Sequence, residues 1–264
     1  SYATNAFDEN ITLDDAQSEL TVASDGLLLR QTSMLCSYYT PVGGVPGPYW
    51  DSYDGSSWSR DAAFPDGTTD YSGKNLVYST QAHSATLTGT NSFNDVYILD
   101  GKKMIIEGGG KITVENIFVQ DNSDTESAIM YSGSSLNVKA NSLGNLTYKR
   151  NLGTENWYLV SSPVAGETYD DAYVTANSLA ISGTNNAIGS YVPADNTWSY
   201  MQNGDAAANF NVGHGYSVRR ETGQGAGDIS FTGTINTASV ETSSLAAGFN
   251  LIGNPYTSFV NSAT

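Results

Sequence analysis

The feature that most constrains the fold is a series of short strand-like segments between Asp95 and Arg150. VYIL, MIIEG, KITVENIFV, AIMYSG and SLNVKA follow one another, with Gly, Asn, Ser or Asp in the turns between them. Short apolar runs bounded by turn residues are typical of β-strands. Because no long loop separates these runs, they favour the rungs of a parallel β-solenoid, with a plain β-meander as the alternative.

The rest of the chain also favours strands over helices. Few windows place apolar residues at the i, i+3, i+4 and i+7 positions of an amphipathic helix, and only 14–23 and 205–210 are short candidates. After Arg150 the strand-like runs lengthen and their connections grow, as in WYLVSS, YSVRR and ISFTGTI. We therefore expect an all-β protein in which a short β-solenoid-like region, 1–150, is followed by an antiparallel β-sandwich, 151–264. In this sandwich we expect Trp157 to lie in the core.

Composition excludes two classes of partner. The 264 residues carry a formal net charge of −16, and only 14% of them are charged. Such an acidic field repels nucleic-acid phosphates, so we expect no nucleic-acid partner. No apolar run approaches the roughly 20 residues that cross a bilayer, so we expect no membrane insertion. The single cysteine, Cys36, cannot form an internal disulfide.

The most prominent candidate binding feature is an aromatic cluster near the N-terminus. Tyr49, Trp50, Tyr53 and Trp58 lie in a stretch rich in Gly and Pro, which predicts an ordered irregular loop. Flat amphipathic rings on a rigid loop suit stacking on sugars or anchoring a protein partner. The alternative is a structural cap, in which these rings shield the end of the solenoid core.

The stretch DNSDTES is the best candidate for a metal site. It places Asp121, Asp124 and Glu126 among other oxygen-bearing residues. Calcium takes six to eight oxygen ligands on flexible backbone, so calcium is the cofactor that this stretch would bind. The alternative is a solvated acidic turn that holds no metal.

Candidate catalytic groups are sparse. The chain has two histidines: His83 is expected on a strand and His214, between two glycines, in a turn. A solenoid hydrolase would need acids that face one another from successive rungs, for which Glu107, Glu115 and Asp121 are the candidates. The sequence places no two of them on one face, so we expect the chain not to be an enzyme.

Several motifs resemble a known kind of module when they are taken in order. NLTYKRNLGTENWYLVSSPVAG is followed by NNAIGSYVPADNTWSYM, VGHGYSVRR, ISFTGTINT and GFNLIGNPYTSFV. This order is similar to a β-sandwich module of large secreted and cell-surface proteins of Bacteroidota, which are exported by the type 9 secretion system. The resemblance implies a closing strand at Gly248–Ile252, an extracellular location, and further sequence, including a sorting domain, beyond the residues seen here.

The favoured function is therefore a non-catalytic extracellular module, a stalk or adhesin, of a larger bacterial surface or secreted protein. Its expected partners are surface glycans or other cell-surface proteins, within a longer chain or assembly. The first alternative is a carbohydrate-binding module, which requires exposed rings beside polar groups. The second is a polysaccharide-degrading β-solenoid enzyme, which requires a groove with facing acids.

Overall fold

The described part of the chain is almost entirely β-structure. The computed structural model describes residues 11–13, 19–22, 28–30, 34–42, 45–53, 58–61, 71–72, 75–78, 84–98, 103–120, 126–241 and 245–260, and before residue 71 it describes the backbone alone. These residues include one α-helix, α1 (Asp171–Ala176), and the rest of their regular structure is strand. The expected all-β class is confirmed. No helix among the described residues is long and apolar enough to cross a membrane.

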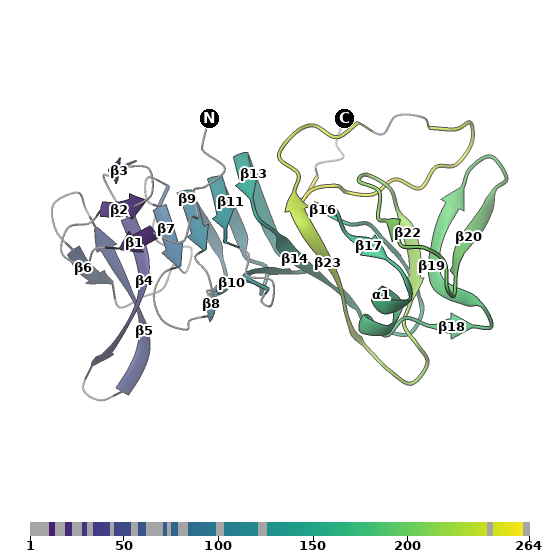
Figure 1. The fold of residues 1–264 in the computed structure, drawn as a ribbon, viewed down its shortest axis with the longest axis horizontal. Helices are drawn as coiled ribbons and strands as arrows, with labels where there is room; N and C mark the ends of the chain where they lie inside the picture. The colour runs from purple at the N-terminus through teal and green to yellow at the C-terminus, as the bar shows by residue number, and fades with distance from the viewer. Residues whose placement is uncertain are drawn as a thin grey trace. The chain divides into compact units, whose positions relative to one another are not determined.

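The chain divides into two compact units, which are described separately. Unit 1 contains residues 1–129 and 136–144, and unit 2 contains residues 130–135 and 145–264. Figure 1 labels the elements of both units along the chain. The boundary expected after residue 150 falls inside strand β14 (Leu146–Leu152).

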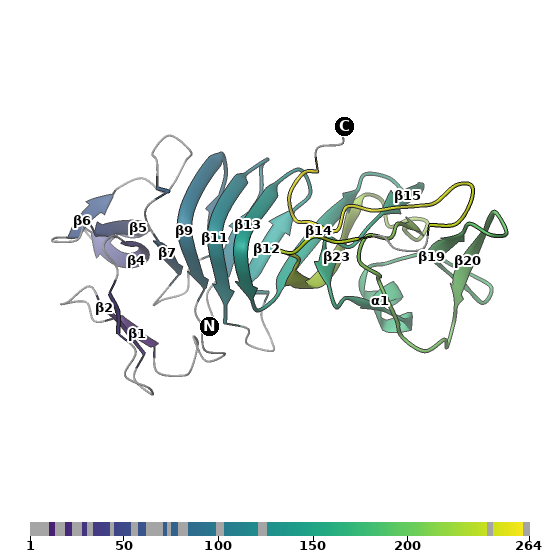
Figure 2. The same cartoon turned by 90° about the horizontal axis from the view of Figure 1, so that it is seen from above.

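The main sheet of unit 1 contains a continuous series of parallel strands. Its parallel ladder joins β4 (Met34–Val42), β7 (Asn75–Tyr78), β9 (Thr90–Ile98) and β11 (Lys111–Val119). Next to β11 lies β13 (Ser135–Leu143), and Figure 2 shows β9, β11 and β13 side by side. Each strand pairs with one that comes later in the chain, so the path returns to the same edge after each intervening segment.

The segments between successive strands of the main sheet contain strands of a second sheet. Strand β8 (Ser84–Leu87) pairs in parallel with β10 (Lys103–Ile106), and the Met104 N–H donates to the carbonyl of Ser127, just before β12 (Ala128–Tyr131). The chain thus alternates between strands of the main sheet and strands of this second sheet. That alternation is what the short, closely spaced runs of the sequence encode.

The N-terminal part of unit 1 is antiparallel. A small sheet contains β1 (Ile11–Leu13), β2 (Glu19–Val22) and β3 (Leu28–Arg30). On the main sheet, β5 (Val45–Tyr53) pairs with β4, and β6 (Trp58–Asp61) pairs with β5. The Gly- and Pro-rich stretch for which we expected an irregular loop therefore contains two strands.

Equivalent positions of successive strands stack on one another in unit 1. Val96 lies opposite Ile117, and Tyr97 opposite Phe118, with these two rings stacked at a centroid distance of 5.0 Å. All four side chains are buried. Each of these strands covers the apolar side chains of the previous one, so the core is built layer by layer along the sheet.

A ladder of polar side chains, the amide ladder, runs through the same strands. It consists of Asn75, Asp95, Asn116 and Asn141. Asn75 Oδ1 accepts from the Asp95 N–H at 3.1 Å, Asp95 Oδ1 accepts from Asn116 Nδ2 at 2.7 Å, and Asn116 Oδ1 accepts from Asn141 Nδ2 at 2.8 Å. Because three of the four are buried, these bonds replace the water that their polar atoms lose on folding.

The turn at Gly144, after β13, allows a close backbone approach. Gly144 has φ of +84°, and a Cβ there would lie 2.1 Å from the carbonyl oxygen of Val119. Gly109 has a nearly identical φ of +81°, yet a Cβ there would meet nothing within 4 Å. The two glycines therefore share the left-handed conformation and differ in crowding.

We expect Gly144→Ala to destabilise unit 1 far more than Gly109→Ala does. Left-handed backbone costs a non-glycine residue about 1–2 kcal/mol at both positions, and the collision with Val119 adds about 1–3 kcal/mol at Gly144 alone. Urea unfolding followed by circular dichroism measures both variants. Equal losses would show that the approach of Gly144 to Val119 is relaxed in solution.

Unit 2 contains two larger antiparallel sheets. The first has the order β16 (Val164–Ala165), β23 (Gly227–Ile235), β14. The second, called here the outer sheet, has the order β15 (Trp157–Val160), β22 (Tyr216–Arg219), β19 (Asn185–Val192), β18 (Ile181–Ser182), and β20 (Thr197–Gln202) also pairs with β19. A short pair joins β17 (Thr168–Tyr169) to β21 (Ala208–Asn209).

The aromatic side chain of Phe210 connects the two sheets in the core of unit 2. The ring of Phe210 lies within 4.7–5.2 Å, centroid to centroid, of four other rings. Those rings belong to Tyr169, Tyr173, Tyr216 and Phe231. Tyr216 comes from the outer sheet and Phe231 from the first sheet, so Phe210 connects the two layers. Tyr173 lies on α1, whose first turn is capped by the Asp170 carboxylate at 2.9 Å from the Tyr173 N–H.

The expectation of a strand at Gly248–Ile252 is wrong. The structure gives this stretch a single β-bridge, between Ile252 and His214, and Phe249 is 82% exposed. The segment is held by the bond from the Gly253 N–H to Gly213 O at 2.9 Å. Its apolar pattern suggested a strand, but a run of backbone bonds to a neighbour is needed to form one.

Candidate functional site

The aromatic cluster predicted near the N-terminus lies on paired strands. Tyr49, Trp50 and Tyr53 belong to β5 and Trp58 to β6, with Tyr53 opposite Trp58. Their side chains lie outside the described residues. Their role in ligand binding stays a prediction.

The predicted calcium ligands are described only in part. Asp121 and Asp124 lie outside the described residues, and Glu126 is exposed just before β12. Among the residues whose side chains are described, no group of three or more His, Cys, Asp or Glu could hold a metal ion. The calcium site stays a prediction.

The acids proposed for a hydrolase lie on the surface of unit 1 where they are described. Glu107 and Glu115 are both exposed, and a Glu115 oxygen is 3.8 Å from Lys139 Nζ. Asp121 and His83 lie outside the described residues, and His214 is exposed at its turn.

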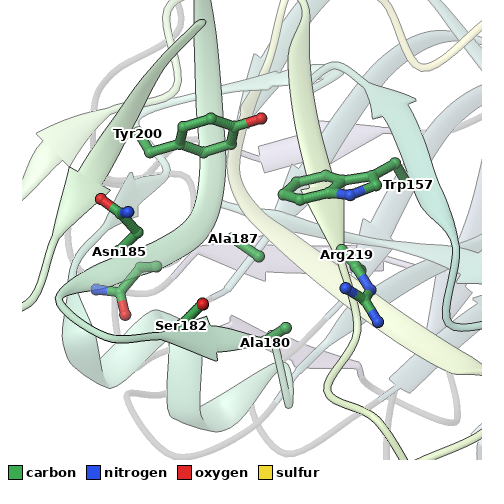
Figure 3. A pocket seen from close by; sticks show the side chains of 8 residues that line it. Trp157, Ala180, Ser182, Asn185, Ala187, Tyr200 and Arg219 are labelled. Carbon is green, nitrogen blue, oxygen red and sulfur yellow. The ribbon is translucent and has the colours of Figure 1, made fainter.

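A hollow of about 220 Å³ opens on the outer sheet of unit 2. Figure 3 shows rings, amides and a guanidinium gathered around it. Its lining consists of Trp157, Ala180, Ser182, Asn185, Asn186, Ala187, Tyr200 and Arg219. These residues come from five strands, β15, β18, β19, β20 and β22, and from Ala180 just before β18, so the site depends on the folded sheet and on no single loop.

The alternation of β15 explains why a tryptophan lines this hollow. Tyr158 and Val160 lie on the more buried side of the strand, whereas Trp157 and Leu159 are 48% and 60% exposed. Successive side chains of a strand point to opposite faces, so the burial of Val160 turns Trp157 outward. The expectation that Trp157 lies in the core is therefore wrong, because the pattern WYLV is apolar on both faces and does not say which one is buried.

A glycine holds the second ring in place. Gly189 lies opposite Tyr200 in the pairing of β19 with β20, and a Cβ on Gly189 would lie 2.8 Å from Tyr200 Cε1. The absence of that Cβ lets the Tyr200 ring lie on the backbone of β19. From there it meets Trp157 at a centroid distance of 5.6 Å and an interplanar angle of 54°. The two rings support each other, which fixes the orientation of Trp157.

Small residues between the large ones create the space. Figure 3 shows Trp157 and Arg219 on one side of the hollow and Tyr200 and Asn185 on the other. The lining between these two sides consists of small residues, Ala180, Ser182 and Ala187. Longer side chains at those three positions would fill the volume. The hollow is thus a consequence of the sequence on β18 and β19.

The polar groups of the lining are oriented by neighbours outside it. Arg219, opposite Trp157 in the β15–β22 pairing, donates from Nε to Glu155 O at 2.9 Å. Asn186 donates from Nδ2 to Asp171 Oδ1 at 2.8 Å, and its buried Oδ1 has no hydrogen-bond partner. Because the Asp171 carboxylate requires the amide nitrogen, the orientation of the Asn186 amide is fixed.

This arrangement can bind a small polar molecule that has an apolar face. A half-exposed indole offers a flat surface, and the Asn185 amide and the Arg219 guanidinium offer hydrogen bonds at its margin. Arg219 and Asn186 lie in the motifs VGHGYSVRR and NNAIGSYVPADNTWSYM, but these motifs indicate only strands and assign neither residue to a site. The one usable signal was a tryptophan at the start of a strand whose fourth residue is a buried valine.

Comparisons with known proteins add no relative. No protein-family model, curated protein or solved structure matches the chain.

Proposed function

We propose that this chain is a non-catalytic extracellular module, a stalk or adhesin of a larger bacterial surface or secreted protein, and that it contacts glycans through the hollow on the outer sheet. The observation that carries the proposal is the half-exposed Trp157, which packs against Tyr200 and lies beside the Arg219 guanidinium and the exposed Asn185 amide. Aromatic rings stack on the C–H faces of sugars, and neutral amides form hydrogen bonds with sugar hydroxyls. A hydrolase would instead need positioned carboxylates.

The architecture supports the stalk part of the proposal. We interpret the alternating parallel strands of unit 1 as rungs of a short β-solenoid, and the two sheets of unit 2 around Phe210 as a β-sandwich. Stacked rungs with a buried amide ladder make a stiff spacer, because each layer is fixed by the next. A stiff scaffold that presents a binding surface suits attachment between a cell and its surroundings.

The location and the export route rest on the sequence. The polar, acidic and weakly charged composition and the order of the β motifs support an extracellular protein of the type 9 secretion class. Other cell-surface proteins are the second class of partner, for which the exposed Phe249 and Ile252 offer apolar contacts. Calcium at Asp121, Asp124 and Glu126 is proposed as a separate, structural feature.

A glycan panel tests the proposed function. We expect the chain to bind at least one saccharide, with an affinity that Trp157→Ala lowers about tenfold or more, since loss of one aromatic contact costs roughly 1.4 kcal/mol or more. Trp198→Ala is the matched control, because Trp198 is also exposed but does not line the hollow. A parallel run with EDTA tests calcium.

Two results would contradict the proposal. One is the absence of glycan binding by the folded chain. The other is binding that survives Trp157→Ala and disappears in the double variant Trp50→Ala and Trp58→Ala, which would place the site in the N-terminal aromatic cluster.

A further inference from the structure

We infer that the hollow on the outer sheet selects a saccharide that carries a carboxylate, a hexuronate, and that Arg219 receives this carboxylate. The inference rests on the proposed glycan binding and adds the charge class of the sugar. Three observations support it: the lack of an ion pair to Arg219 among the described residues, its remaining hydrogen-bond donors, and the exposed ring and amide that line the hollow with it.

Among the described residues, Arg219 has no ion pair with a carboxylate. The chain has 27 acidic and 11 basic residues, so a cation without an acidic partner is unexpected. Yet the acceptors of Arg219 in the described part of the chain are both neutral: the carbonyl oxygen of Glu155 at 2.9 Å and Thr222 Oγ1 at 3.3 Å. No carboxylate among the described residues lies within ion-pair distance of Arg219.

Two acids close to Arg219 in the fold are turned toward backbone groups. Glu155 Oε1 accepts from the N–H groups of Gly223 and Gly225, both at 2.7 Å. The Glu221 carboxylate accepts from the Ile181 N–H at 3.1 Å and the Thr222 N–H at 2.9 Å. Both carboxylates are thus oriented toward backbone N–H groups, and neither forms an ion pair with Arg219.

Arg219 retains the donors that a carboxylate needs. A guanidinium has five N–H groups, and the two contacts above use Nε and one N–H of Nη2. The remaining donors, on Nη1 and Nη2, form the planar fork that binds a carboxylate through two parallel hydrogen bonds. These bonds also fix the distance of the ligand from Trp157, because Trp157 and Arg219 are directly opposite in the sheet.

The other lining groups match a sugar ring. The half-exposed Trp157 indole offers a flat surface, and the exposed Asn185 amide lies across the hollow from it. A pyranose has both a C–H face for the indole and hydroxyls on its edge for the amide, so a hexuronate supplies these two contacts and the carboxylate for Arg219.

Titration of the whole chain with three small ligands, followed by ¹H–¹⁵N NMR, tests the inference. D-galacturonate, D-galactose and cyclohexanecarboxylate differ in the carboxylate and in the hydroxyls. We expect galacturonate to bind about tenfold or more tightly than either of the others, the effect of one charge-assisted contact of roughly 1.4 kcal/mol. Its affinity should fall as salt is raised.

Two variants assign the effect to the guanidinium. Arg219→Gln should lower the affinity for galacturonate to that for galactose and leave the affinity for galactose unchanged. Arg219→Lys keeps the charge, loses the fork and should lie between the two. Arg150→Gln is the control, because it removes the same charge at a position outside the lining.

The outcomes separate this inference from the proposed function. If wild type binds galactose as tightly as galacturonate and Trp157→Ala weakens both, the carboxylate inference is overturned and glycan binding stands. If cyclohexanecarboxylate binds as tightly as galacturonate, the sugar assignment is overturned. If neither sugar binds the folded chain, both the inference and the proposed site are overturned.

Discussion

Phe210→Ala is expected to lower the free energy of unfolding of unit 2 by about 3–5 kcal/mol, the range for removing a large aromatic side chain from a packed core. The Phe210 ring is 1% exposed and packs against four aromatic rings from both sheets, β17 and α1. Its loss leaves a cavity that the two sheets cannot both move to fill. Since a typical domain is stable by about 5–15 kcal/mol, the loss takes a large part of the total.

Chemical denaturation measures this effect, with Phe249→Ala as the matched control. Both variants remove the same benzyl group, but Phe249 is 82% exposed and its loss should change stability by less than about 0.5 kcal/mol. Equal effects of the two substitutions would contradict the packing described for unit 2.

Asn116→Ala is expected to destabilise unit 1 by about 2–5 kcal/mol. The substitution removes the donor to Asp95 Oδ1 and the acceptor of two bonds from Asn141, at 2.8 Å and 3.2 Å. Asp95 would keep only the Tyr97 hydroxyl, 3.3 Å away, among its described side-chain donors. Each buried polar group that loses its partner costs about 1–3 kcal/mol, and more when it is charged.

Asn137→Ala provides the comparison for the amide ladder. Asn137 lies on the neighbouring strand β13 but is exposed, so its loss should cost less than about 0.5 kcal/mol. Urea unfolding of both variants distinguishes a buried ladder from ordinary strand propensity. A loss below 1 kcal/mol for Asn116→Ala would mean that the ladder does not contribute to stability as described.

The fold class could be predicted from sequence because it depends on local patterns. Turn residues between short apolar runs indicated strands, and the described residues contain strands at most of those runs. The face that each strand buries could not be predicted where both faces are apolar, and for this reason the prediction that Trp157 lies in the core is wrong. At Gly248–Ile252 a strand-like pattern lacked a partner strand, and only the fold determines that.

The site was less predictable than the fold. Arg219, Asn186 and Tyr200 come from three different strands, and only the sheet order brings them to one hollow. The role of Gly189 in making room for the Tyr200 ring can be recognised only from the strand pairing, which places the two residues opposite each other. The aromatic clusters that sequence favoured were those close together along the chain, whereas the described site is assembled from positions far apart in it.

The most direct test of glycan binding at the hollow follows the indole N–H signals of the four tryptophans by NMR during titration with D-galacturonate and, separately, with D-galactose. Single substitutions assign the signals to Trp50, Trp58, Trp157 and Trp198. The structure predicts a saturable shift of the Trp157 signal, with the signals of Trp50 and Trp58 unchanged. Saturable shifts confined to Trp50 and Trp58, or no shift with either sugar, would contradict the account.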